Sequence, residues 1–133
     1  MTRTAKVAMA LLISVAAGCG GGSGGGSGPA GVDSSKSVAT VTDAEKGSLC
    51  DWFVGMVGGY GAPATCASAQ LMAPPDKATC MMTFPSCDVT VAQFEDCVQR
   101  MVAAQNACTD TAIATAIAAP SCQTVGMAGC FNN

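Results

Sequence analysis

The sequence predicts a mostly α-helical fold: a small, disulfide-rich domain of three to four short helices that follows a disordered glycine- and serine-rich tether. Eight of the nine cysteines lie within residues 42–133, a density typical of exported disulfide scaffolds. Apolar residues recur in the same segment at three- and four-residue spacings after helix-capping motifs. The tether is predicted by the run GGGSGGGSGPAG over residues 20–31, which has too few large side chains to offset the entropy lost on ordering.

The N-terminus has the features of an export signal. Residues 1–6 carry two bases and no acid, and residues 7–17 are an uncharged run of eleven residues. That run is too short to cross a hydrocarbon core of about 30 Å as a helix, so we interpret residues 1–18 as a signal peptide. The motif Ala16-Ala17-Gly18-Cys19 resembles the lipobox of bacterial lipoproteins. This resemblance implies cleavage before Cys19, diacylglycerol on its sulfur, and an acyl chain such as palmitate on its amine.

An ordinary secretory signal, which would leave Cys19 as a thiol, is the alternative. The cysteine count favours lipidation, because using Cys19 leaves an even set of eight in a compartment that oxidises thiols. Two or three acyl chains hold a protein stably at a membrane. We therefore expect an exported, lipid-anchored protein of the bacterial cell envelope. By resemblance to lipoprotein sorting in enteric bacteria, Gly20 after Cys19 favours the outer membrane.

Residues 19–41 are predicted to be the lipidated cysteine and a flexible linker, and the folded domain is expected over residues 42–133. A phosphate-binding glycine loop is the alternative interpretation of residues 20–31. Such a loop requires a preceding strand, a following helix and usually a Gly-Lys-Ser/Thr ending. The sequence has none of these features, so we favour the linker.

Two helices are predicted in the first half of the domain. The capping box Thr42-Asp43-Ala44-Glu45 predicts a helix over residues 43–57, which Gly58-Gly59 would end. A second helix of about two turns is expected after Pro74-Pro75-Asp76, and Pro85 would stop it.

Two more helices are predicted in the second half. The capping box Thr90-Val91-Ala92-Gln93 predicts a helix over residues 91–105. Alanine-rich residues 109–119 favour a further helix, with Asp110 as its cap and Pro120 as its stop. Residues 121–133 are expected to form a loop or a single turn.

The eight cysteines of the domain are expected to pair as four disulfides. Zinc or iron–sulfur ligation is the alternative, but it usually needs close pairs such as CxxC. The closest cysteines here are seven residues apart, and the chain has no histidine. Because Cys50 and Cys97 both lie mid-helix in apolar stripes, we expect a bridge between them. The predicted disulfide cysteines are Cys50, Cys66, Cys80, Cys87, Cys97, Cys108, Cys122 and Cys130.

The residue types argue against an enzyme. Without histidine there is no imidazole base, no Ser-His-Asp triad and no Cys-His pair. A hydrolase with paired carboxylates is the alternative, but the nine acids are dispersed and a chain of about ninety residues seldom supplies the necessary cleft. Asp43, Asp76 and Asp110 stand where helix caps are expected. We therefore expect no catalytic residue and no cofactor.

Charge and residue type also limit the partners. Without residues 1–18 the chain has nine acids and four bases, and no basic run, so nucleic acid is disfavoured. The methionines are expected to fill the core, which is the commoner role of this residue. Copper ligation by their sulfur atoms is the alternative, and no metal is expected. Two interpretations are open for Tyr60 with Asp51-Trp52: an exposed contact site, or aromatic side chains that plug the edge of the core. We favour the second. The methionines concerned are Met56, Met72, Met81, Met82, Met101 and Met127.

The mature domain resembles small cysteine-rich predicted lipoproteins of myxobacterial type, which have no assigned activity. The resemblance rests on Leu49-Cys50-Asp51-Trp52, Gly58-Gly59-Tyr60-Gly61 and the segment TVAQFEDC over residues 90–97. Plant-type lipid-transfer proteins also combine eight cysteines with helices, but this chain lacks their adjacent Cys-Cys and Cys-x-Cys pairs.

We expect a lipid-anchored cell-envelope protein whose domain is a non-enzymatic interaction or structural module, with an envelope or extracellular protein as its partner. The alternative is an inhibitor or a small-ligand carrier, because rigid disulfide scaffolds suit both. An apolar cavity of several hundred cubic ångströms would favour the carrier.

Overall fold

The computed structural model describes residues 26–64, 66 and 71–131. These residues contain a short 3₁₀ helix, five α-helices and no strand beyond two isolated bridges. The predicted mostly α-helical, disulfide-rich fold is therefore confirmed. The elements are η1 (Val38–Thr40), α1 (Asp43–Met56), α2 (Lys77–Met82), α3 (Val91–Ala107), α4 (Asp110–Ile117) and α5 (Pro120–Met127).

Both predicted capping boxes are present. The hydroxyl of Thr42 accepts the backbone N–H of Glu45 at the start of α1, and the carboxylate of Glu45 accepts the N–H of Thr42 in return. Thr90 and Gln93 make the same reciprocal pair at the start of α3. Each box satisfies backbone donors that the first turn of a helix leaves without a partner.

Only one of the three aspartates expected at helix caps is a cap. Asp76 caps α2, where its Oδ1 accepts the N–H of Thr79 at 2.7 Å. Asp43 and Asp110 are instead the first residues of α1 and α4, and the threonines before them are the caps. A carboxylate in the first turn still interacts favourably with the positive end of the helix dipole.

The expected loop over residues 121–133 is wrong for its first part, which forms α5. Pro120 does not merely stop α4, because it is the first residue of α5. Proline suits that position, since the N–H that it lacks would have no partner within the helix and its fixed φ is already helical. Ala119 separates the two helices with an extended backbone, at φ −64° and ψ 141°.

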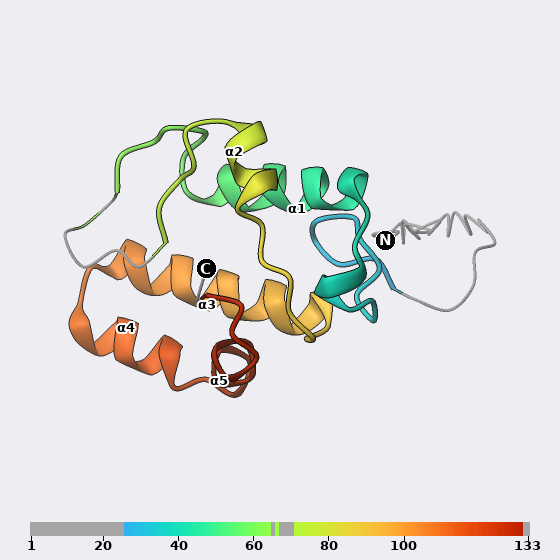
Figure 1. Ribbon diagram of the computed structural model, residues 1–133. Coiled ribbons are helices and arrows are strands. Elements are labelled where there is room, and N and C mark those ends of the chain that lie inside the picture. The colour runs from blue at the N-terminus through green and yellow to red at the C-terminus, as the bar shows by residue number, and fades with distance from the viewer. Residues whose placement is uncertain (1–25, 65, 67–70, 132–133) are drawn as a thin grey trace, which may run out of the picture.

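The helices form two groups (Figure 1). Helix α1 packs with α2 on one side of the molecule, and α3 packs with α4 and α5 on the other. Apolar residues from both groups share one core, in which Leu49 of α1, Val91 of α3 and Val125 of α5 are completely buried. None of the helices in the described part of the chain is long and apolar enough to cross a membrane.

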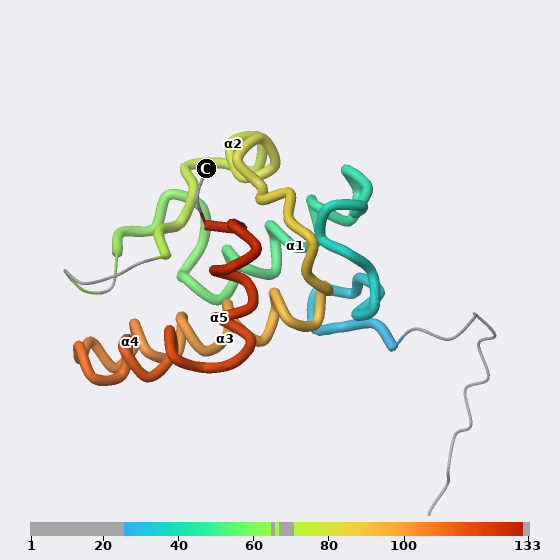
Figure 2. The backbone as a smooth tube through the Cα atoms, turned by 60° about the horizontal axis from the view of Figure 1, so that its bottom comes forward, coloured from blue at the N-terminus to red at the C-terminus, as the bar shows by residue number. Residues whose placement is uncertain are grey.

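Residues 26–41, which were expected to belong to the linker, are part of the folded body. Val32 and Val38 are buried in the core. The backbone N–H of Val38 donates to Val89 O at 2.8 Å, and that of Val91 donates to Lys36 O at 2.8 Å. This pairing places the N-terminal segment beside the start of α3 (Figure 2). The predicted signal peptide, Cys19 and the first part of the predicted tether lie outside the described residues.

Candidate functional site

Three disulfides connect the helices. Cys50–Cys80 joins α1 to α2, and Cys97–Cys122 joins α3 to α5. Cys87–Cys130 joins the segment between α2 and α3 to the chain after α5. The expected Cys50–Cys97 bridge is therefore wrong. Both cysteines do lie on buried helix faces, but α1 turns that face to α2 while α3 turns its own to α5.

The other two cysteines of the domain lie beside each other. The Sγ atoms of Cys66 and Cys108 are 3.3 Å and 3.1 Å from the same acceptor, the carbonyl oxygen of Gln105. A hydrogen bond with Cys66, together with partial desolvation, raises the pKa of the Cys108 thiol. A fourth bridge remains a prediction.

An apolar pocket of about 270 Å³ lies between the two groups of helices. Its walls come from α1, the chain that enters and leaves α2, α3, and the chain after α5. The lining residues are Leu49, Cys50, Phe53, Leu71, Met72, Pro74, Cys80, Thr83, Phe84, Pro85, Phe94, Val98, Cys130 and Phe131.

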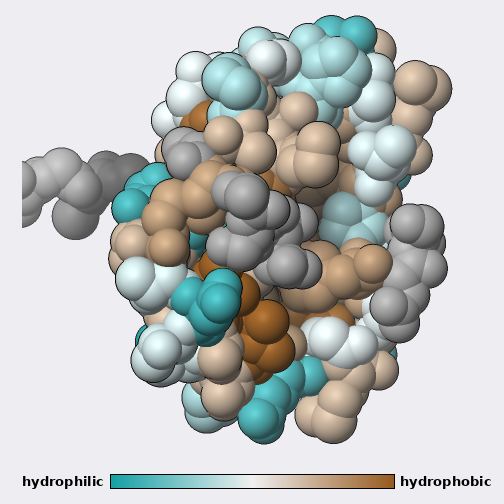
Figure 3. Space-filling model, turned by 90° about the vertical axis from the view of Figure 1, so that its left-hand side faces the viewer, coloured by the Kyte–Doolittle hydropathy of each residue, from teal (hydrophilic) through white to brown (hydrophobic). Residues whose placement is uncertain are grey.

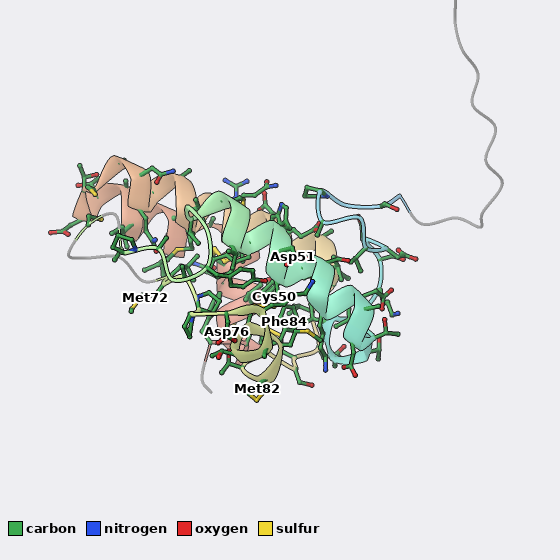
Figure 4. The ribbon with its side chains drawn as sticks, turned by 90° about the horizontal axis from the view of Figure 1, so that it is seen from above. Cys50, Asp51, Met72, Asp76, Met82 and Phe84 are labelled. Carbon is green, nitrogen blue, oxygen red and sulfur yellow. A yellow bond between two sulfur atoms is a disulfide. The ribbon has the colours of Figure 1, made fainter. Side chains whose placement is uncertain are left out.

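Two phenylalanines pack together in the lining of this pocket. The rings of Phe84, after α2, and Phe94, in α3, have centroids 5.7 Å apart and planes tilted by 56°. Aromatic pairs favour tilted arrangements at such a distance. Figure 4 shows Phe84 and Cys50 lying inward beneath α1, whereas Met72 and Met82 lie at the outer edge of the molecule.

Two of the three disulfides contribute to the wall of the pocket. Both members of the Cys50–Cys80 bridge line it, as does Cys130 of the Cys87–Cys130 bridge. The Cys97–Cys122 bridge lies outside it. The walls on the α2 side and at the chain end are therefore fixed covalently, and the pocket is preformed.

Among the described residues that line the pocket, none has a charged side chain. Thr83 supplies its one hydroxyl, and that hydroxyl donates to Thr79 O at 2.9 Å within the chain. A buried ionic group would find no partner of opposite charge there, and burying an unpaired charge is costly. The pocket therefore suits an uncharged, apolar group.

A polar cluster links α1 and α2 outside the pocket. Asp51 accepts the Lys77 ammonium at 2.6 Å and the Tyr60 hydroxyl at 2.9 Å, and these two interactions lower the pKa of Asp51. Desolvation and the hydrogen bond to Asp51 raise the pKa of Tyr60 to about 12. Trp52 packs against the core as favoured above, whereas Tyr60 is 36% exposed.

Met101 fills the core, as expected for the methionines, but the most exposed methionines do not. Met72, Met82 and Met127 are exposed by 72%, 78% and 82%. Of these three, only Met72 lines the pocket. On the face seen in Figure 3, a patch of strongly apolar side chains lies below the centre, and hydrophilic side chains lie beside it, below it and at the top of the view.

The described residues of the pocket offer mainly apolar contacts. Among the residues described, no three His, Cys, Asp or Glu side chains are grouped so that they could hold a metal ion. Leu49 and Phe53 of α1 and Val98 of α3 line the pocket, but helical spacing of apolar residues does not by itself distinguish a filled core from a pocket wall.

Comparison with protein-family models, with curated proteins and with solved structures finds no match for this chain.

Proposed function

We propose that this protein is a lipid-anchored, non-enzymatic cell-envelope protein whose helical domain binds a small uncharged apolar ligand. The observation that carries the binding function is the pocket, whose volume is about 270 Å³ and whose described lining residues carry no charged side chain. It favours the small-ligand carrier over a purely structural module.

The size of the pocket limits the ligand. An apolar cavity of about 150 Å³ in another protein binds benzene, and drug-sized ligands occupy pockets of about 300–1,000 Å³. A pocket between these sizes takes a group larger than benzene, such as a two-ring aromatic or a short alkyl chain. Transfer of that group from water to the apolar lining drives binding.

The anchor is the part of the proposal that rests on sequence alone. Lipidation of Cys19 would place the domain close to the outer membrane, where apolar compounds concentrate. Mass spectrometry of the mature N-terminus tests it: a lipid-modified Cys19 supports the anchor, and an unmodified N-terminus contradicts it. The variant Cys19→Ser should leave the membrane fraction, provided that Cys19 is the attachment site.

Two matched fluorescent probes test the ligand class. N-phenyl-1-naphthylamine and 8-anilino-1-naphthalenesulfonate share their aromatic rings, but only the second carries a sulfonate. We expect saturable one-site binding of the neutral probe and affinity at least about tenfold lower for the anionic probe, because the lining offers no counter-charge. Equal affinities, or no saturable binding of the neutral probe, would refute the proposed ligand class.

The runner-up function is an interaction module in which the pocket takes an apolar side chain of an envelope protein. Native mass spectrometry of the full protein extracted from its own membrane separates the two. A reproducible small-molecule mass increment that the neutral probe displaces supports the carrier. A protein-sized increment, lost when the pocket is filled by the probe, supports the module instead.

A further inference from the structure

We propose that Cys66 and Cys108 form a fourth disulfide by exchange with an external disulfide, and that the reverse exchange with two external thiols, which become a disulfide, opens this bridge while the protein stays folded. The pair is distinct from the apolar pocket, since neither cysteine lines it. It constitutes a covalent redox site on the surface of the domain.

The position of the two sulfur atoms carries the pairing. Each lies within 3.3 Å of the carbonyl oxygen of Gln105, so the two sulfurs are neighbours. Cys108 ends α3 in the left-handed conformation, with φ 50°, and its backbone N–H donates to the same carbonyl. The turn thus points the Cys108 side chain back toward the segment that carries Cys66.

Cys66 and Cys108 are more exposed than the cysteines of the three formed disulfides. Each of the six cysteines in the three formed bridges is at most 7% exposed. Cys108 is exposed, and Cys66 is partly exposed. Thiol–disulfide exchange requires an attacking thiolate to reach a sulfur, so accessible disulfides react before buried ones.

The exchange balances with a disulfide-bearing oxidant as co-reactant. One cysteine of the pair, as its thiolate, attacks a sulfur of that disulfide, forms a mixed disulfide and releases one thiolate. The second cysteine attacks the protein sulfur of the mixed disulfide, which closes the Cys66–Cys108 bond and releases the other thiolate. Two electrons pass to the oxidant, which takes up the two thiol protons and becomes two thiols.

Gln105 connects this redox site to the wall of the pocket. Its side-chain amide holds Leu71 twice, because Oε1 accepts the Leu71 N–H and Nε2 donates to Leu71 O. Leu71 lines the pocket, and Gln105 is almost completely buried. Closing the bridge ties Cys66 to the end of α3, beside the Gln105 that holds Leu71, so the oxidised protein should bind the apolar ligand more tightly.

The pairing is tested on the full protein by alkylation and peptide mapping. Under a mild reductant we expect Cys66 and Cys108 to be alkylated first, while the three buried bridges stay closed. In a second sample of the selectively reduced protein that has not been alkylated, oxidised glutathione should remove both reactive thiols and lower the mass by two hydrogens. The variants Cys66→Ser and Cys108→Ser should each leave one thiol that oxidised glutathione converts to a stable mixed disulfide. A bridge from either cysteine to another partner, or earlier opening of Cys97–Cys122, would overturn the pairing.

The effect on the pocket rests on the proposed binding function and has a separate readout. We expect the affinity for the neutral naphthylamine probe to be about fivefold higher in the oxidised than in the selectively reduced protein, at the lower end of coupling between protein sites. Equal affinities would refute the coupling but leave the pairing intact. Absence of probe binding in both states would count against the binding function itself, since the mass measurement still reports the bridge.

Discussion

Phe84 and Phe94 join the two groups of helices at the pocket. Phe84 belongs to the chain that leaves α2, Phe94 belongs to α3, and their ring centroids are 5.7 Å apart. The pocket therefore shares its aromatic wall with the contact that holds the domain together. Changes there should affect both stability and binding.

Phe84→Ala is expected to destabilise the domain by about 2 kcal/mol, less than the 3–5 kcal/mol for a fully buried phenylalanine because Phe84 is only half-buried. Urea unfolding measures this change. Phe131→Ala is the control, since Phe131 also lines the pocket but is 47% exposed, and it should cost less than about 1 kcal/mol. Equal losses in the two variants would contradict a structural role for the Phe84–Phe94 pair.

Met72→Asp should weaken binding of the neutral naphthylamine probe at least about tenfold, because it places a carboxylate in the apolar wall. Met82→Asp is the matched control: Met82 is similarly exposed but does not line the pocket, so the affinity should stay within about twofold. Fluorescence titration gives both affinities. A similar loss in the two variants would indicate binding outside the pocket.

The double variant Cys50→Ser/Cys80→Ser is expected to lose about 2–4 kcal/mol of stability and also most of its probe affinity, because that bridge lines the pocket. Cys97→Ser/Cys122→Ser should lose a similar amount of stability while the folded fraction keeps its affinity. Denaturant unfolding and probe titration measure the two quantities separately. Unchanged probe affinity after loss of Cys50–Cys80 would show that this wall does not contribute to binding.

Glu45 should make stability fall at acid pH. The Lys36 ammonium, at 2.6 Å, and the Thr42 N–H lower the pKa of Glu45 from 4.5 to about 2. The pKa of Glu45 is lower in the folded than in the unfolded state, so its ionised carboxylate stabilises the fold above the unfolded pKa. This stabilisation is lost as the pH falls toward about 2. Glu45→Gln keeps a capping box without this titration. The stability difference from wild type should be under about 1 kcal/mol at neutral pH, since both charged side chains are partly exposed, and should shrink in acid. A difference that does not change with pH would contradict this assignment.

Glu95 should make stability fall as the pH rises, which is the opposite of the effect of Glu45. It is 3% exposed beneath the N-terminal turn, and burial raises its pKa although the Ala30 N–H donates to it at 3.1 Å. With a folded pKa above the unfolded one, stability falls as the pH rises from about 4.5 through the folded pKa, by about 1.4 kcal/mol for each pH unit that separates the two pKa values. Urea unfolding of Glu95→Gln across this range should lack that decline. Parallel curves for wild type and variant would refute the prediction.

The helices that could be predicted are those whose signals are local. Capping boxes and apolar spacing lie within one segment of chain, so α1 and α3 begin at the predicted residues. Pro120 was ambiguous because proline both ends one helix and suits the first position of the next. No feature of the sequence around Val32 and Val38 predicts that these residues are buried. Their burial depends on backbone pairing between residues 34–38 and the distant residues 89–92.

The sequence by itself determined the helical class, the two capping boxes and the need for cross-links, because these follow from neighbouring residues and from composition. Only the tertiary structure decided that Cys50 pairs with Cys80 and Cys97 with Cys122, and that an apolar space remains between the two groups of helices. Helical spacing identifies the face that is buried but not the element that buries it, and partner choice depends on contacts between residues far apart in the chain.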